Sequence, residues 1–198
     1  YRSGANASMR EALADVVRDA LAHADLQPGD AVLDIGANDG TLLANYPPGI
    51  IRVGIDPDLK TSDVDDHATL GYRDYWPTTR ALRSYLRIHL VDPPKFKIIT
   101  SVAAGLYHTD DPNAFVAAIK EHLHPQGLWI AQFQDATMVL DNVAVDYFCH
   151  EHVTLWDFAS FQALLHRHSL HIERAHRNEV NGGSIRYHVR HDDATIDP

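Results

Sequence analysis

The stretch 33-LDIGANDGT-41 decides the fold of this chain. It begins inside the apolar run 31–35 and continues into a turn that carries Gly36 and Gly40. A site for a dinucleotide has glycines spaced G-x-G-x-x-G and a helix N-terminus that is free to receive a pyrophosphate. Here the spacing is G-x-x-x-G, and Asp39 stands where a phosphate would need space and positive charge. The turn therefore favours a cofactor that is positively charged and has no phosphate.

A second acidic residue follows the next apolar run. The segment 50-IIRVGID-56 ends in Asp56, 20 residues beyond Gly36. An acid at the end of this strand is placed to accept hydrogen bonds from both hydroxyls of a ribose. S-adenosylmethionine has the ribose and the positive charge that these two features predict. A plain strand-to-helix turn, made tight by glycine, is the alternative, but it explains only one half of the pattern.

Strands and helices alternate along the rest of the chain. Near-continuous apolar strands separated by helices indicate a parallel sheet that is covered on both faces. Helices are expected over 6–24, 42–46, 79–89, 112–123 and 155–168, and strands over 31–35, 50–56, within 69–76, and over 95–102, 128–133, 169–176 and 183–189. Thr154 and Asp157 have the spacing of a capping box for the last helix.

The pattern D-x-G-x-x-x-G followed by a strand-end acid resembles that of class I S-adenosylmethionine-dependent methyltransferases. The resemblance implies a Rossmann-like three-layer α/β fold, with a mostly parallel seven-stranded sheet whose last strand is antiparallel. It also implies S-adenosylmethionine as the methyl donor and S-adenosylhomocysteine as the product. The residues of these two segments that are expected to bind the cofactor are Asp34, Gly36, Ala37, Asn38, Asp39, Gly40, Asp56 and Pro57.

Length and composition limit the class of protein. At 198 residues we expect one domain, 1–198, with an N-terminal helix in 1–24, a cofactor-binding half in 25–135 and a substrate-side half in 136–198. A formal net charge of -10 argues against nucleic acid as a partner. No apolar run is long enough for a membrane span or a secretion signal. A single cysteine, Cys149, excludes an intrachain disulfide and suits a cytoplasmic protein. The oligomeric state stays open.

The segment 148-FCHEHVTLW-156 concentrates groups that bind metal or move protons. A zinc site needs three or four ligands, only Cys149 and Glu151 are nearby to complete one with the two histidines, and H-E-H is not the H-E-x-x-H of a helical zinc site, so we expect no metal. Capping of the next helix is a second interpretation. Catalysis is the third, because the segment follows the strand 128–133, whose carboxyl end should border the cofactor cleft.

Most of the chain resembles the C-methyltransferases of deoxysugar biosynthesis, which methylate a nucleotide-linked keto-sugar beside its carbonyl. The resembling stretches are YRSG with SMR, LDIGANDGTLL, GIDP, ITSVAAGLYHTDDPNAFVAAIKEHLHPQGLWI, FCHEHVTLW and NEVNGGSIRYHV, in the family's order. The resemblance implies that His152 is the base that removes a proton from the acceptor, a role that suits imidazole near neutral pH. Glu151 would orient His152 or contact the substrate, and Tyr1 matches a tyrosine near the active site.

The resemblance also extends to the ends of two strands. Ser101 and Ala103 fall where the family lines the methionine part of the cofactor. Gln132 and Gln134 flank the end of the strand 128–133, and either amide could form a hydrogen bond with the substrate. Solvated polar residues are the alternative interpretation of the two glutamines.

Four further residues are expected on the substrate side. Cys149 takes the place of a tyrosine that often precedes this motif in the family, and His150 follows it. Asn181 and Ser184 belong to the NGGS motif and would shape a loop near the substrate. The NGG sequence is equally typical of a hairpin turn.

Family members usually carry a cysteine-rich zinc domain before this region and a further α/β domain after it, and both help to hold the nucleotide-sugar. The sequence contains neither and begins at Tyr1, so we expect either the catalytic core of a longer protein or a compact relative with another acceptor. Three other functions stay open: an O- or N-methyltransferase, a cofactor-binding core without activity, and a nicotinamide-dependent redox enzyme. Asp39 and the glycine spacing disfavour the last of these.

Overall fold

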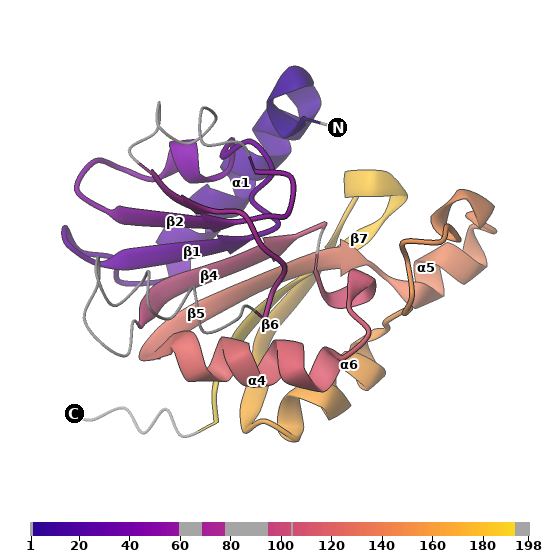
Figure 1. Cartoon of the computed structure of the whole chain (residues 1–198). Helices are drawn as coiled ribbons and strands as arrows, with labels where there is room; N and C mark the ends of the chain where they lie inside the picture. Colours follow the sequence, from indigo (N-terminus) through magenta and orange to yellow (C-terminus); the bar gives the residue numbers. More distant parts are fainter. Residues whose placement is uncertain (1, 60–68, 78–94, 104, 193–198) are drawn as a thin grey trace.

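Seven strands form one sheet in the order β3-β2-β1-β4-β5-β7-β6 (Figure 1). The computed structural model describes residues 2–59, 69–77, 95–103 and 105–192. β7 is antiparallel to both of its neighbours, and the other six strands run in one direction, which confirms the predicted fold. The strands are β1 (Ala31–Ile35), β2 (Ile51–Ile55), β3 (Thr69–Tyr72), β4 (Phe96–Val102), β5 (Leu123–Gln134), β6 (Leu170–Asn178) and β7 (Ser184–His191).

Helices cover both faces of the sheet (Figure 1). α1 (Ala7–His23) packs on one face, and α4 (Pro112–His122) and α6 (Phe158–His166) pack on the other. Successive side chains of β1 serve the two faces in turn: Val32 packs with α1, whereas Leu33 belongs to the core beneath α4 and α6. Every residue of β1 is buried, which explains why its sequence is a continuous apolar run with one acid.

The strand order reverses between β1 and β4. From β1 the chain builds outward through β2 and β3 and then returns to β4 on the other side of β1. In open α/β sheets, ligands bind in the crevice at the carboxyl ends of the strands where this reversal occurs. The glycine turn after β1 and the segment after β4 both lie at this point.

The predicted helix over 42–46 was wrong. The structure has only the short 3-10 helix η2 (Leu43–Asn45) there. Pro47 and Pro48 follow directly, and proline can neither donate the next helical hydrogen bond nor tolerate a helical residue before it. The glycine turn is therefore not followed by a regular helix whose N-terminus could bind a phosphate.

Two predictions on the substrate-side half also need correction. α6 begins later than expected, and its capping box joins Asp157 to Ser160, whose N–H donates to Asp157 Oδ1 at 2.8 Å. The Thr154 hydroxyl donates instead to the carbonyl of Leu106. A short helix that the sequence did not predict, α5 (Ala136–Asp141), follows β5 and is capped by the side chain of Asp135.

The remaining elements are short. The 3-10 helices are η1 (Ser3–Ala5), η3 (Leu106–His108), η4 (Val145–Tyr147) and η5 (Val180–Gly182). The third strand expected within 69–76 is confirmed as β3, whereas the helix expected over 79–89 lies outside the described residues. In the described part of the chain, no helix has the length and apolar character that a membrane crossing requires.

Candidate active site

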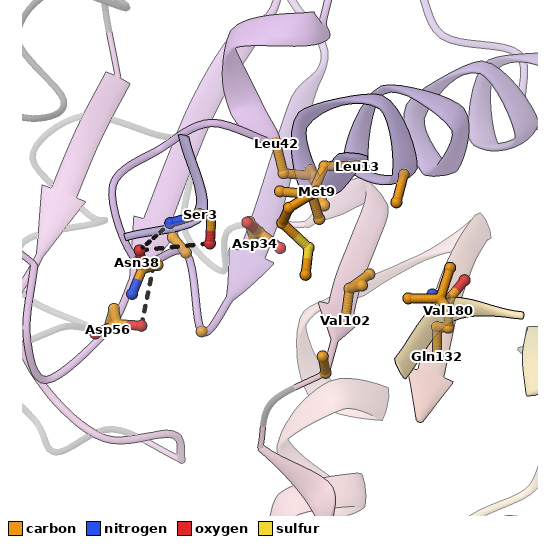
Figure 2. A pocket seen from close by; sticks show the side chains of 14 residues that line it. Ser3, Met9, Leu13, Asp34, Asn38, Leu42, Asp56, Val102, Gln132 and Val180 are labelled. Carbon is orange, nitrogen blue, oxygen red and sulfur yellow. Dashed lines mark hydrogen bonds between the residues drawn. The ribbon is translucent and has the colours of Figure 1, made fainter. Parts of the chain in front are cut away.

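A cavity of about 130 Å³ lies at the carboxyl ends of the central strands, next to the start of α1 (Figure 2). Two carboxylates, Asp34 and Asp56, lie in a wall that is otherwise largely apolar. The lining residues are Ser3, Met9, Ala12, Leu13, Asp34, Gly36, Ala37, Asn38, Leu42, Asp56, Val102, Ala103, Gln132 and Val180. Six of the ten residues predicted to bind the cofactor are therefore brought together here: Asp34, Gly36, Ala37, Asn38, Asp56 and Ala103.

Asp34 is the buried acid of the cavity, with 3% of its surface exposed. Its Oδ1 accepts a hydrogen bond from the hydroxyl of Thr100 on the neighbouring β4, at 2.6 Å. Burial raises the pKa of Asp34 to about 7; the hydrogen bond from Thr100 opposes this rise, and the nearby carboxylate of Asp56 adds to it. A cationic group beside Asp34 would favour its ionised form.

Asp56 lies directly after β2 and is held by the backbone around it. Its Oδ2 accepts a hydrogen bond from the N–H of Asn38 at 3.0 Å, and its Oδ1 accepts one from the N–H of Asp58 at 2.7 Å. The N–H groups of Gly36 and Ala37 donate to the carbonyl of Ile55, so the glycine turn folds over the end of β2. These contacts bring the turn and the strand-end acid, 20 residues apart, into one site.

Two residues of the turn have backbone angles that suit glycine. Gly36 has a φ of 78°, and Gly40 has a φ of 76°. Most side chains avoid this left-handed region, which explains the G-x-x-x-G spacing. Asn38 also has a positive φ of 51°, a conformation that asparagine tolerates better than most residues.

Asp39 does not line the cavity. Its carboxylate accepts hydrogen bonds from the N–H of Gly4 at 2.9 Å and from the hydroxyl of Thr41 at 2.6 Å. Burial works to raise the pKa of Asp39, but the hydrogen bonds from Thr41 and Gly4 outweigh it and lower the pKa. Asp34 and Asp56, and not Asp39, are the carboxylates that line the cavity, and contact between Asp39 and the cofactor stays a prediction.

The N-terminal segment closes one side of the cavity through these contacts. The N–H of Ser3 donates to Asn38 Oδ1 at 3.0 Å (Figure 2). The next N–H along the chain, that of Gly4, donates to Asp39. A Cβ atom at residue 4 would lie 2.8 Å from Thr41 Oγ1, so only glycine fits this close approach. Tyr1, which the family resemblance places near the active site, lies outside the described residues.

The other predicted cofactor residues lie around the cavity without lining it. Gly40 is buried in the turn, and Pro57 follows Asp56. Ser101 is buried in β4, where its hydroxyl accepts a hydrogen bond from the indole N–H of Trp129 at 3.0 Å. Whether these residues contact the cofactor stays a prediction.

The segment with His150 and His152 lies between η4 and α6, against η3. The N–H of Val153 donates to the carbonyl of Tyr107 at 2.9 Å, and η3 itself follows the end of β4. Since five residues lie between His152 and the start of α6 at Phe158, the two histidines do not cap that helix. His152 does not line the cavity but belongs to the loops that continue from its β4 side.

His152 is held in one orientation. Its Nδ1 lies 2.6 Å from the carbonyl oxygen of Tyr147. A carbonyl can only accept, so Nδ1 carries the proton, and the neutral ring keeps its lone pair on Nε2. The ring packs among Tyr107, Tyr147 and His108, with centroid distances of 4.8, 4.5 and 5.3 Å. In the described part of the chain, the Glu151 carboxylate contacts His150 rather than His152, and both roles suggested for Glu151 stay predictions.

The three residues before His152 are exposed. The side chain of His150 is 93% exposed, and its Nε2 lies 3.9 Å from a carboxylate oxygen of Glu151. Cys149 is also exposed and carries a free thiol. The structure brings none of these three side chains into the cavity, and their contact with a substrate stays a prediction.

The NGGS motif forms the turn between β6 and β7. Asn181 is exposed with a φ of 54°, and the Ser184 hydroxyl donates to the carbonyl of Val180 at 2.9 Å. The side-chain amide of Gln134 donates to the carbonyl of Asn181, so Gln134 supports this turn and lies outside the cavity. Gln132, two residues earlier on β5, lines the cavity instead.

Sequence reasoning missed the apolar wall of the cavity. Met9, Leu13 and Leu42 line it from the N-terminal side, and Val102 and Val180 line it from the ends of β4 and β6. In the sequence these residues are indistinguishable from core residues of amphipathic helices and strands. The resemblance of the stretches around YRSG and SMR was the one signal that the N-terminal segment belongs to the site.

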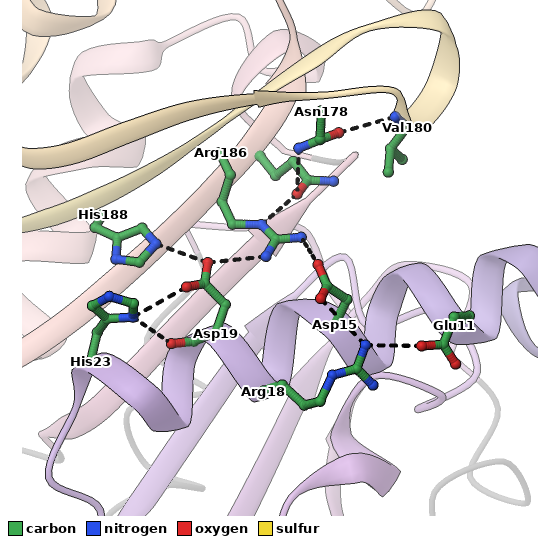
Figure 3. A network of polar contacts seen from close by, with 10 residues as sticks. Glu11, Asp15, Arg18, Asp19, His23, Asn178, Val180, Arg186 and His188 are labelled. Atoms are coloured by element: carbon green, nitrogen blue, oxygen red, sulfur yellow. Dashed lines mark hydrogen bonds and ion pairs between the residues drawn. The ribbon is translucent and has the colours of Figure 1, made fainter.

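One group of possible metal ligands occurs among the described residues, outside the cavity. Asp19, His176 and His188 offer atoms that lie within 4.8 Å of one another. Asp19 Oδ2 already accepts hydrogen bonds from Arg186 at 3.0 Å and from His188 at 2.9 Å (Figure 3). The charge of Arg186 would repel a metal ion at this position, so the group serves to join α1 to β7.

The sheet order, the antiparallel β7, the acid near the end of β1 and the acid after β2 define a class I methyltransferase. The profile of a family described as methyltransferase domains matches residues 5–174. The chain belongs to this family and is an S-adenosylmethionine-dependent methyltransferase. No curated protein matches the sequence.

Solved structures share the fold at low sequence identity. Magnesium protoporphyrin IX methyltransferase from Synechocystis, solved with bound S-adenosylhomocysteine, is 14% identical with a TM-score of 0.64, covering 91% of this chain and 82% of its own. A chain from the Haloferax volcanii complex of the Trm112 methyltransferase activator with a protein described as a methyltransferase is 15% identical with a TM-score of 0.64, covering 92% and 94%. An S-adenosylmethionine-dependent methyltransferase from Clostridium acetobutylicum is 14% identical with a TM-score of 0.59, covering 91% of each chain.

Proposed function

We propose that the chain methylates a carbon atom beside the carbonyl group of a small keto-sugar-like acceptor, with His152 as the general base. When bound, S-adenosylmethionine supplies an electrophilic methyl group. A carbon beside a carbonyl becomes nucleophilic only after it loses a proton, so this reaction needs a base. The observation that carries the proposal is the 2.6 Å contact between His152 Nδ1 and the carbonyl of Tyr147.

This contact prepares His152 for proton abstraction. With Nδ1–H donated to Tyr147, the lone pair of Nε2 is available for the proton of the acceptor. The positive charge that the ring then gains is stabilised by the same carbonyl. The ring centroids of His108 and His152 lie 5.3 Å apart. Burial lowers the pKa of His108, and the proximity of His152 lowers it further, so the neutral form of His108 is favoured. His152 therefore has a fixed ring orientation, and the neighbouring His108 does not have to be positively charged.

The carboxylates of the cavity fit the cofactor. We propose that Asp56 accepts hydrogen bonds from the ribose hydroxyls and that Asp34 lies near a positively charged group of the methionine part. Asp34 is buried beside a second acid, and a cation would offset the cost of ionising it there. The backbone of Gly36 and Ala37, without bulky side chains, leaves room for the cofactor to approach the turn.

Turnover with a nucleoside-diphosphate-linked keto-sugar tests the proposal. The enzyme is incubated with S-adenosylmethionine labelled in its methyl group, and the product is examined by NMR for a new carbon-bound methyl. His152→Gln should lower kcat by about 100-fold or more, as expected for loss of a general base. Affinity for S-adenosylhomocysteine, measured by calorimetry, should not change.

His166→Gln is the matched control, because that imidazole is exposed on α6 and does not line the cavity. It should retain the activity of the wild type. Equal activity in His152→Gln and the wild type would show that His152 is not the base. Binding of S-adenosylhomocysteine without turnover of any acceptor would indicate a cofactor-binding core.

Methylation of a hydroxyl or an amine is the second candidate. The same Nε2 lone pair would accept a hydroxyl proton. His152 also lies outside the cavity lining, which leaves room for a larger acceptor between His152 and the cavity. In that case the NMR experiment would show the new methyl group on oxygen or nitrogen.

A further inference from the structure

Gln132 places a hydrogen-bond donor in an apolar part of the cavity. The side chain is 2% exposed and lies near the end of β5, beside Val102 of β4 and Val180 of η5 (Figure 2). Its Oε1 accepts a hydrogen bond from Arg186 Nε at 2.7 Å and another from Asn178 Nδ2 at 3.3 Å (Figure 3). Because both partners are donors, they must face the oxygen of the amide, and its NH₂ group points the other way.

This orientation is locked by Arg186. The guanidinium is buried and also donates to Asp19 and Asp15 on α1, at 3.0 Å each. A flip of the Gln132 amide would turn its NH₂ toward the N–H of Arg186 and leave donor facing donor. Arg186 is thus a positioning residue: it acts on the cavity through Gln132.

The Gln132 NH₂ group makes no hydrogen bond with any residue in the described part of the chain. The group lines the cavity, where water can reach it and where a ligand that supplies an acceptor atom can take the place of that water. Met9, Leu13, Val102 and Val180, which line the cavity around it, offer no such atom from their side chains.

The order of strands indicates which ligand Gln132 meets. Asp56 follows β2, Asp34 lies in β1, Val102 ends β4 and Gln132 lies in β5. Since these strands are neighbours in that order, the four residues lie in the same order across the site. Asp56 and Gln132 are three strand spacings apart, roughly 14 Å. With the ribose at Asp56 and the methionine part at Asp34, the β5 side is left for the acceptor.

From this geometry we propose that the N–H of Gln132 binds the carbonyl oxygen of the methyl acceptor, and that Arg186 holds Gln132 in position for this contact. The inference rests on the proposed function. An N–H donor suits an oxygen that gains negative charge when the neighbouring carbon loses its proton. The two acids at the other end of the cavity would repel that oxygen and so set the direction in which the acceptor binds.

Two substitutions of Gln132 test the proposal. Gln132→Glu keeps an oxygen for Arg186 and Asn178 but replaces the NH₂ group with a second oxygen, and Gln132→Met removes both functions at similar length. With a nucleoside-diphosphate-linked keto-sugar, both should raise KM for the sugar or lower kcat/KM by about tenfold to hundredfold. Affinity for S-adenosylhomocysteine should stay within about threefold of the wild type, a change worth less than a typical hydrogen bond.

Gln126→Glu is the matched control, since Gln126 lies on the same strand but is exposed and outside the cavity. It should retain wild-type kinetics. Arg186→Lys keeps a cation for Asp15 and Asp19 but loses the Nε donor to Gln132, so it should raise KM for the sugar without changing affinity for S-adenosylhomocysteine.

Three results would overturn the proposal, and they are distinguishable. Wild-type kinetics in both Gln132 variants would show that the amide does not meet the acceptor. A parallel loss of affinity for S-adenosylhomocysteine would assign the amide to the cofactor. Absence of turnover by the wild type with every keto-sugar would overturn the proposed function, and with it the carbonyl partner, before any variant is compared.

Discussion

Asp34 is the residue whose chemistry depends most on its surroundings. In the sequence it is one acid at the end of an apolar run, whereas in the structure it is buried, bonded to Thr100 and close to Asp56. Burial raises the pKa of Asp34 to about 7, so near neutral pH the group takes up or releases a proton in response to a nearby charge.

The first prediction concerns Asp34 and pH. The ionised carboxylate attracts a cation, so the affinity of the wild type for S-adenosylmethionine should increase as pH rises from 6 to 8, through the pKa of about 7. Asp34→Asn should bind more weakly at pH 8 and lose most of this pH dependence. Calorimetry at the two pH values measures both effects. Equal pH dependence in the two proteins would contradict the role of Asp34.

The second prediction concerns buried tyrosine hydroxyls. The hydroxyls of Tyr147 and Tyr187 are buried and have no hydrogen-bond partner among the described residues. Burial raises the pKa of Tyr147 to about 12 and raises that of Tyr187 as well. Tyr147→Phe and Tyr187→Phe should each increase the free energy of unfolding by about 1 kcal/mol, because they remove an unsatisfied polar group.

Chemical denaturation measures this change, and Tyr75→Phe is the control, since Tyr75 is 73% exposed. It should leave the midpoint unchanged. A lower stability for Tyr147→Phe would mean that its hydroxyl supports the loop around His152 in a way that the static contacts do not show.

At the scale of elements, α1 joins two parts of the site. Just before its N-terminus, Ser3 and Gly4 are bonded to Asn38 and Asp39 of the glycine turn. Further along, Asp15 and Asp19 bind Arg186 of β7. The helix thereby holds the N-terminal wall of the cavity against the sheet at both positions.

The third prediction is that the bond between α1 and β7 matters for stability. Arg186→Met should lower the free energy of unfolding by about 3 kcal/mol, because it leaves half-buried Asp19 without its guanidinium partner. Arg18→Met is the control on the same helix: Arg18 pairs with Glu11 and Asp15 at the exposed surface, and its loss should have no measurable effect. Urea denaturation compares the wild type with the two variants. Equal losses of stability in the two variants would argue against a special role of Arg186 in joining α1 to β7.

For the whole molecule, the cavity predicts which ligand stabilises the fold. S-adenosylhomocysteine at 100 times its Kd should add about 2.7 kcal/mol to the free energy of unfolding. For a chain of this size the increase in Tm should be roughly 5–10 °C. NADH should give no increase, because its pyrophosphate would meet Asp34 and Asp56. A shift with NADH alone would contradict the assignment of the cofactor.

Much of this molecule follows from local patterns. The strands at β1, β2 and β4, and their order as a class I methyltransferase sheet, were predictable because buried parallel strands need continuous apolar runs. The positions of Asp34 and Asp56 at strand ends were predictable for the same reason. The helix predicted over 42–46 does not form, because the two prolines that follow outweigh the apolar spacing of this segment.

Side-chain direction could not be read from the sequence. Asp39 looked like a cavity residue, but its carboxylate turns to Thr41 of the same turn and to Gly4, which the folded N-terminus brings to it. Gln132 and Gln134 are equivalent in the sequence, yet Gln132 enters the cavity while Gln134 supports the β6–β7 turn.

The sequence by itself thus determined the sheet, the class of enzyme and the two acids that line the cavity, because these depend on spacing along one or two neighbouring segments. Only the tertiary structure decided which polar groups face the cavity, which carbonyl orients His152 and which guanidinium holds Gln132. The bond between Arg186 and Gln132 joins residues 54 positions apart, and its direction arises only when the two strands pair. The contact between His152 and Tyr147 is local, but it forms only because the loop between η4 and α6 folds back on itself.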